Sequence, residues 1–137
     1  MKKTRIDLVK SWLKKAERDF KVAQRELFSD EPFTDIVCFH AQQAVEKYLK
    51  AYLTGLDIYF ERTHNIEDLV LLIAQKDETI LDLKDTGTEL TPYAIETRYP
   101  EFEEPALDDA TDAVEIAEKF RDFIINRLSK GIESERK

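Results

Sequence analysis

The sequence has few of the residues that interrupt or cross-link a chain. Its 137 residues include one cysteine, three glycines and four prolines. The lone Cys38 excludes an intrachain disulfide, a cysteine-rich zinc site and a CxxC redox motif. Because glycine and proline are the main breakers of regular structure, their scarcity predicts long regular elements.

Long apolar runs are missing as well. Apolar runs in the chain extend over only a few residues, whereas a membrane-spanning helix needs roughly 20. The opening stretch "MKKTRIDLVKSW" also lacks the apolar core of a signal peptide. We therefore expect a cytoplasmic protein that does not associate with a membrane.

Charge is abundant and unbalanced. The chain has 29 acidic and 21 basic residues, which gives a net charge of -8. Such a surface repels polyanions at long range, so any nucleic-acid binding must depend on a local basic cluster. Hydrophobic residues make up 42% of the chain, enough for a core, and the length fits one domain over residues 1–137.

Apolar residues recur at helical spacing in the first half of the chain. Residues 5–28 predict a helix with one buried stripe, formed by Val9, Trp12, Leu13, Ala16, Phe20, Ala23 and Leu27. A second helix has a broad apolar arc, formed by Val37, Ala41, Ala44, Val45, Tyr48, Leu49, Ala51 and Tyr52. Phe39 and Leu53 fall outside that arc. This predicts a helix that is central in a bundle or shared with a second subunit, and we expect a homodimer.

Helical signals continue in the second half. Asn65 is predicted to cap a short helix over "IEDLVLLIAQK". The segment from about Glu78 to Thr97 reads as a helix that Gly87 and Pro92 kink or divide. Proline then makes "RYPEFEEPA" an irregular acidic loop.

A last helix is predicted after this loop. Asp108 or Asp109 should cap it and Gly131 should end it, with "IESERK" frayed. Its inward stripe consists of Ala110, Ala113, Val114, Ala117, Phe120, Ile124 and Leu128. Because no strand-like alternation occurs, the fold class is all-α: an up-and-down four-helix bundle with a short additional helix.

Two groups of polar residues are candidates for ligand binding. His40, Gln43 and Lys47 share one flank of the second helix and form either a polar strip facing a groove or an ordinary solvated edge. Arg98 and Tyr99 follow a helix end, where an arginine either complements the helix dipole or offers its donors to phosphate.

Signatures of metal and nucleotide chemistry are largely missing. The Glu-x-x-His spacing of a di-iron bundle occurs once, at Glu61 and His64, where two such motifs and further glutamates are needed. Walker, G-x-G-x-x-G and G-x-S-x-G motifs do not occur. We expect neither metal nor another cofactor.

Four stretches together resemble the HEPN family, the higher eukaryote and prokaryote nucleotide-binding domain. They are "WLKKAERDFKVAQREL", "VCFHAQQAVEKYLKAYL", "THNIEDLVLLI" and "IETRYPEF", and the resemblance spans nearly the whole chain. It implies a dimeric bundle of four main helices with a short extra one. It also implies a minimal nucleotidyltransferase as partner, in a toxin-antitoxin-type pair.

Active ribonucleases of that family use an arginine followed by four to six residues and a histidine, without metal. After Arg98 this window holds Glu103, Glu104 and Pro105, and no histidine follows His64. The resemblance thus implies Arg98 and Tyr99 at the family's site without a catalytic partner, and no catalytic residue is assigned. The leading hypothesis is a nucleotide- or RNA-binding regulatory protein that is not an enzyme. A metal-independent ribonuclease toxin and a purely structural association module are the alternatives.

Overall fold

The protein is built from helices alone. The computed structural model describes residues 3–136, with side chains described to Gly131, and no strand occurs in this part of the chain. In chain order the elements are α1 (Arg5–Leu27), α2 (Thr34–Gly55), α3 (Ile66–Ala74), the 3₁₀ helix η1 (Glu78–Leu83), α4 (Lys84–Thr88), α5 (Tyr93–Glu96) and α6 (Leu107–Arg136). The predicted all-α class is confirmed.

Helix α1 begins with a capping box. The Thr4 hydroxyl accepts a hydrogen bond from the Asp7 backbone N–H, and the Asp7 carboxylate accepts one from the Thr4 backbone N–H, each at 3.1 Å. These bonds satisfy N–H groups that have no partner inside the helix. The predicted stripe faces the core, with Val9, Ala16 and Phe20 buried.

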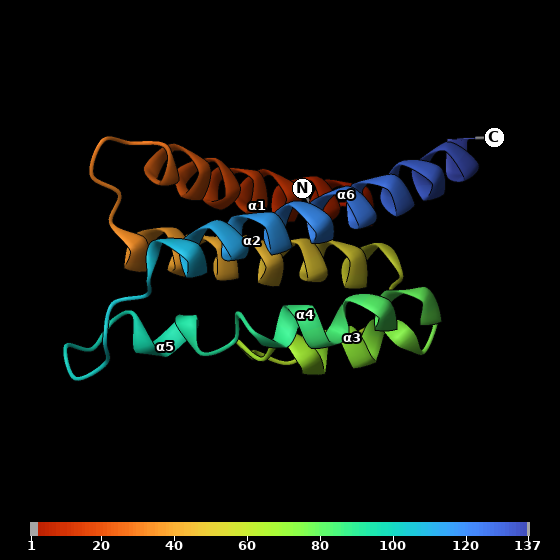
Figure 1. The fold of residues 1–137 in the computed structure, drawn as a ribbon. Helices are drawn as coiled ribbons and strands as arrows, with labels where there is room; N and C mark the ends of the chain where they lie inside the picture. Colours follow the sequence, from red (N-terminus) through yellow and green to blue (C-terminus); the bar gives the residue numbers. More distant parts are fainter. Residues whose placement is uncertain (1–2, 137) are drawn as a thin grey trace.

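Helix α2 is the centre of the molecule. Figure 1 shows it between the pair formed by α1 and α6 and the row of short helices, and it contacts both groups. All eight residues of the predicted arc are buried, and so is Leu53. The second apolar side of α2 is therefore covered within one chain at Leu53, which removes this residue as an argument for a dimer.

The row of short helices begins with α3, which starts after Asn65 as predicted. The Asn65 side chain, however, does not cap it: its Oδ1 is buried without a hydrogen-bond partner. The helix start is stabilised from another segment instead, because the Ile66 backbone N–H donates to Thr91 Oγ1 at 3.2 Å. The capping prediction was thus right for the boundary and wrong for the bond.

The segment expected as one interrupted helix consists of three pieces: η1, α4 and α5. Pro92 precedes α5, as expected for a residue that has no N–H to donate. Gly87 lies in α4, where an added Cβ would be 2.6 Å from Phe120 Cζ of α6. This close approach explains why a glycine occupies a position where it weakens the helix.

Helix α6 departs from the prediction at both ends. It begins at Leu107, and the Asp109 carboxylate accepts from the Ala106 backbone N–H at 3.0 Å from inside the first turn. Gly131 does not end it, since the helix continues to Arg136. An exposed glycine inside a helix costs about 1 kcal/mol, which a long helix tolerates. The expected fraying falls on residues whose side chains lie outside the described part.

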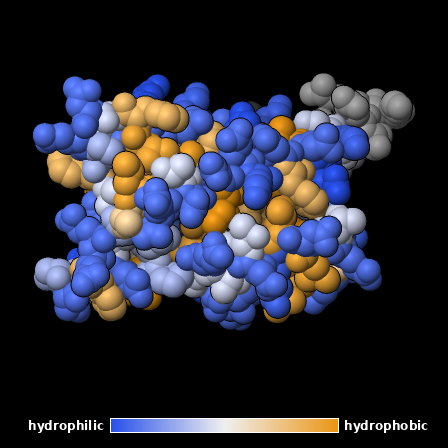
Figure 2. Space-filling model, in the orientation of Figure 1, coloured by the Kyte–Doolittle hydropathy of each residue, from blue (hydrophilic) through white to orange (hydrophobic). Residues whose placement is uncertain are grey.

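Figure 2 shows one face of the molecule, on which hydrophilic residues are interspersed with patches of apolar residues. The most exposed large apolar side chains include Phe28 and Phe33, which flank the turn between α1 and α2, and Leu107 at the start of α6. Among the described residues, no helix combines the length and apolarity needed to cross a membrane.

Candidate functional site

The predicted polar flank of α2 meets a carboxylate of α1. Asp19 is almost fully buried, and it accepts from His40 Nδ1 at 2.8 Å and from the Lys47 ammonium. Because a carboxylate accepts a proton donor, this contact places the proton on Nδ1 and leaves Nε2 unprotonated in the neutral ring. Asp19 therefore fixes the orientation of both side chains and balances the charge of Lys47.

Arg98 reaches the same flank from the end of α5. Its guanidinium carbon lies 5.1 Å from the centroid of the Phe39 ring, which is within the range of a cation–π contact. The Phe39 ring in turn meets the His40 ring edge-on, with centroids 5.3 Å apart. Through Phe39, the structure thus links Arg98 to the flank of α2 that carries His40.

Gln43 belongs to a different cluster, centred on the buried Glu46. Gln43 donates to the neighbouring Gln42 at 2.7 Å, while Glu46 accepts from Lys50 at 2.7 Å and from His64 at 3.0 Å. Burial alone would raise the pKa of Glu46, but the hydrogen bonds from Lys50 and His64 outweigh it and hold the pKa below its ordinary value. Gln43 is therefore engaged in a structural network.

His64 ties the connector between α2 and α3 to this network. Its side chain is 60% exposed, yet Nδ1 bonds the buried Glu46. Among the described residues, no three His, Cys, Asp or Glu side chains are placed so that together they could hold a metal ion. The role of His64 in the structure is thus to anchor the connector.

A second polar network joins the three long helices. The Glu17 carboxylate of α1 accepts from the Tyr48 hydroxyl of α2 at 2.6 Å and from Arg121 of α6 at 2.9 Å. The pairing with Glu17 satisfies the charge of Arg121 inside the bundle. Burial and the hydrogen bond to Glu17 raise the pKa of Tyr48 well above its ordinary value, so its hydroxyl stays protonated.

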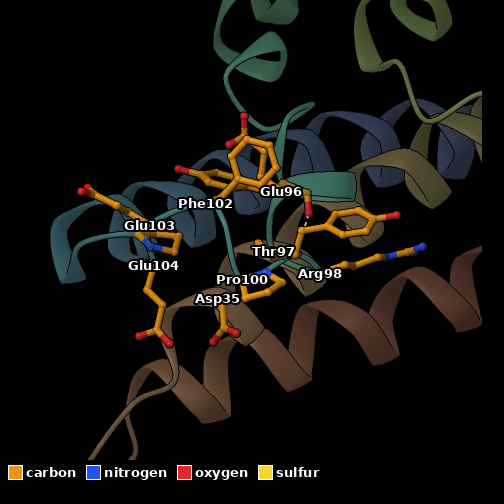
Figure 3. Close-up of a pocket in the computed structure, with 11 residues that line it drawn as sticks. Asp35, Glu96, Thr97, Arg98, Pro100, Phe102, Glu103 and Glu104 are labelled. Atoms are coloured by element: carbon orange, nitrogen blue, oxygen red, sulfur yellow. Dashed lines mark hydrogen bonds between the residues drawn. The ribbon is translucent and has the colours of Figure 1, made fainter.

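A pocket of about 360 Å³ lies beside Arg98. Tyr99 and Phe102 form part of its wall, with 50% and 43% of their surface exposed. Its lining also includes four carboxylates, from Asp35, Glu96, Glu103 and Glu104. Figure 3 shows the Arg98 side chain running away from Glu103 and Glu104, toward the outside of the pocket.

Cys38 of α2 is fully buried near Tyr93, one of the residues that line the pocket. Burial raises the pKa of the Cys38 thiol to about 12, so the thiolate is essentially absent at neutral pH. Cys38 is therefore a core residue and not a nucleophile.

Sequence reasoning missed Asp19 and the acidic lining of the pocket. Asp19 had a readable signal: it lies three residues after Ala16 and four before Ala23, so a carboxylate shares the buried face of α1. The pocket had none, because its residues come from α2, α5 and the loop that follows.

Solved structures of other proteins have a similar arrangement of helices. The crystal structure of TT1696 from Thermus thermophilus has a TM-score of 0.75 and 26% sequence identity, over 86% of this chain and 96% of that one. ST0689, an archaeal HEPN homologue, has a TM-score of 0.70 and 25% identity, over 93% of this chain and 99% of that one. No curated protein matches the chain significantly.

The sequence itself matches the family model of the HEPN domain over residues 9–128. This range contains the Asp19 contacts, the Glu46 network, Arg98 and the pocket. The predicted resemblance is confirmed, and the chain belongs to the HEPN domain family.

Proposed function

We propose that the protein is a regulatory member of the HEPN family that binds a nucleotide or an RNA end and does not cleave RNA. The observation that supports this is the state of Arg98. Its side chain is exposed and rests on the Phe39 ring, and no carboxylate pairs with it in the described part of the chain. A guanidinium with free donors suits a phosphate group.

The surrounding charge sets the strength of this binding. Lys47 and His40 share Asp19 as a partner, so the Asp19 carboxylate balances the positive charge of Lys47. The net charge of -8 opposes the approach of an anion. We expect modest affinity that falls as salt is added.

The test is titration calorimetry with mononucleotides and trinucleotides. Arg98→Ala should lose roughly 1.5–3 kcal/mol of binding free energy, the scale of a hydrogen bond to a charged group. The fold should survive, because Arg98 follows the last residue of α5 and is exposed. Arg62→Ala is the matched control, since Arg62 is also exposed but lies in the connector before α3. Equal binding by wild type and Arg98→Ala would place the site elsewhere.

A metal-independent ribonuclease is the second candidate, and the Asp19–His40 contact favours it. A carboxylate that holds Nδ1 leaves Nε2 as a potential general base, and Arg98 and His40 both contact the Phe39 ring. Against it stands the residue pattern after Arg98, where Glu103, Glu104 and Pro105 replace the histidine of active family members. We expect purified protein to leave RNA intact at neutral pH. Cleavage that Arg98→Ala and His40→Ala both abolish would establish the ribonuclease instead.

Association with other protein chains is a further part of the proposed function. We propose a homodimer that partners a minimal nucleotidyltransferase in a toxin-antitoxin-type pair, on the strength of the family relation and of the exposed apolar side chains at the turn after α1. Sedimentation at micromolar concentration should show a species about twice the 16.0 kDa chain. A 16.0 kDa species alone would contradict the dimer. A nucleotidyltransferase gene beside this one, and copurification of its product, would support the pair.

A further inference from the structure

The pocket beside Arg98 has a composition that does not suit phosphate. Asp35, Glu96, Glu103 and Glu104 line it, while its one cationic residue, Arg98, directs its side chain outward. Four carboxylates repel an anion inside the pocket and accept hydrogen bonds from neutral or cationic N–H donors. The phosphate proposed above therefore has its place outside, at the Arg98 guanidinium, and the pocket needs another occupant.

The aromatic side chains indicate what this occupant is. Tyr99 and Phe102 are half-exposed, and Tyr93 forms a further part of the wall. Proteins bind unpaired nucleobases by stacking them on such rings and by hydrogen-bonding their edges. A volume of about 360 Å³ lies within the size range of small-molecule sites.

The walls of the pocket are held in place before any ligand arrives. Thr34 Oγ1 of α2 donates to the Pro105 carbonyl at 2.6 Å and fixes the end of the loop. Thr97 Oγ1 donates to the Tyr93 carbonyl at 2.7 Å and fixes its beginning. Held at both ends, the loop loses less freedom when a ligand binds than an untethered loop would, which lowers the entropy lost on association.

We infer that this pocket binds the base of a nucleotide that carries an exocyclic amino group, and guanine in particular, while Arg98 binds the phosphate at the rim. The inference rests on the proposed nucleotide-binding function and names its ligand class. Guanine presents N1–H and the N2 amino group side by side, so one carboxylate accepts both. Uracil has no amino group and offers carbonyl oxygens that the carboxylates repel.

The test is calorimetry with GMP, AMP, CMP and UMP at low salt. GMP should bind most tightly and UMP most weakly, with a difference of about tenfold or more, the scale of one good bidentate base contact. The double variant Glu103→Gln/Glu104→Gln should weaken GMP and leave UMP unchanged or tighter, because repulsion falls while the acceptors are lost. Glu101→Gln is the control, since Glu101 is exposed in the same loop but does not line the pocket.

The possible failures are separable. If no nucleotide binds, the proposed function is overturned, and this inference with it. If the four nucleotides bind equally and still depend on Arg98, phosphate binding stands and the base pocket is refuted. If the double variant strengthens GMP and UMP alike, the carboxylates act only by repulsion and the inference is again refuted.

Discussion

The three long helices and the row of short ones are stabilised differently. Helices α1, α2 and α6 have 23, 22 and 30 residues, and each carries a repeating apolar face. The pieces η1, α4 and α5 have six, five and four residues, and each buries a single residue: Ile80, Gly87 or Ala94. Isolated helices of this length are not stable in water, so these pieces depend on the surface that the long helices supply.

This difference separates stability from ligand binding. Most of the buried core comes from the long helices, whereas Arg98, Tyr99 and the greater part of the pocket lining come from α5 and the loop after it. Segments with few buried contacts open more readily than a core does. The candidate site is therefore built on the less stable part of the molecule and is positioned by the more stable part.

The largest expected effect is in the long helices. Phe120→Ala should destabilise the protein by about 3–5 kcal/mol, because it removes a fully buried ring from α6 and leaves a cavity. Urea unfolding followed by circular dichroism measures this loss. A loss of stability below about 1 kcal/mol would mean that side chains of the neighbouring helices move into the space left by the ring. The core would then adapt more readily than expected.

Glu46→Gln should have the next largest effect, roughly 1.5–3 kcal/mol, since Lys50 and His64 lose a charged partner. The pKa of Glu46 is lower in the folded chain than its ordinary 4.5. The ionised form therefore stabilises the fold above this pH, and that contribution is lost as pH falls through the folded pKa. Unfolding measured from pH 7 to pH 3 should show a shallower acid decline in the variant. Parallel profiles would assign the decline to other carboxylates.

Gly87→Ala tests how the short row is attached. The added Cβ would lie 2.6 Å from Phe120 Cζ and 2.9 Å from Ile66 Cγ2, so we expect a loss of about 1–3 kcal/mol from overpacking. Hydrogen exchange should show faster opening of residues 84–97 than of α1. Equal acceleration of hydrogen exchange in residues 84–97 and in α1 would show that the two regions unfold together. The short pieces would then not be less stable than the long helices.

Gly131→Ala is the control for that substitution and the smallest effect. Gly131 lies inside α6, and an added Cβ there would meet no atom within 4 Å. Because alanine favours the helix, this variant should be more stable by up to about 1 kcal/mol. Destabilisation at both glycines would mean that crowding against Phe120 and Ile66 is not the cause of the Gly87 result.

The sequence predicted the long helices well and the junctions less well. The starts of α1 and α3 were found because apolar spacing and cap residues are local signals. The continuation of α6 past Gly131 was missed, because a glycine can end a helix or remain within it, and the choice depends on the whole helix. The division between Glu78 and Thr97 was expected from Gly87 and Pro92, but the 3₁₀ piece was not.

For the candidate site, the sequence placed residues but not their partners. His40 and Lys47 were placed on one flank because they share a helix, whereas Arg98 was placed only at the end of another helix. Their common partner Asp19 lies 21 residues before His40 and is brought near by the packing of α1 on α2. Contacts between distant segments are fixed by tertiary structure, which local spacing does not encode.

The buried Cys38 provides an internal labelling probe of how often the fold opens. Its thiol reacts with alkylating reagents only as the thiolate and only where water and reagent reach it. In the folded protein the thiol is protonated and buried, so neither condition is met. Since Cys38 is the only cysteine in the chain and is fully buried near Tyr93 of α5, the rate of alkylation reports how often the packing around Cys38 opens. Labelling the unmodified protein with and without nucleotide would then show whether the ligand slows this opening, with no introduced probe.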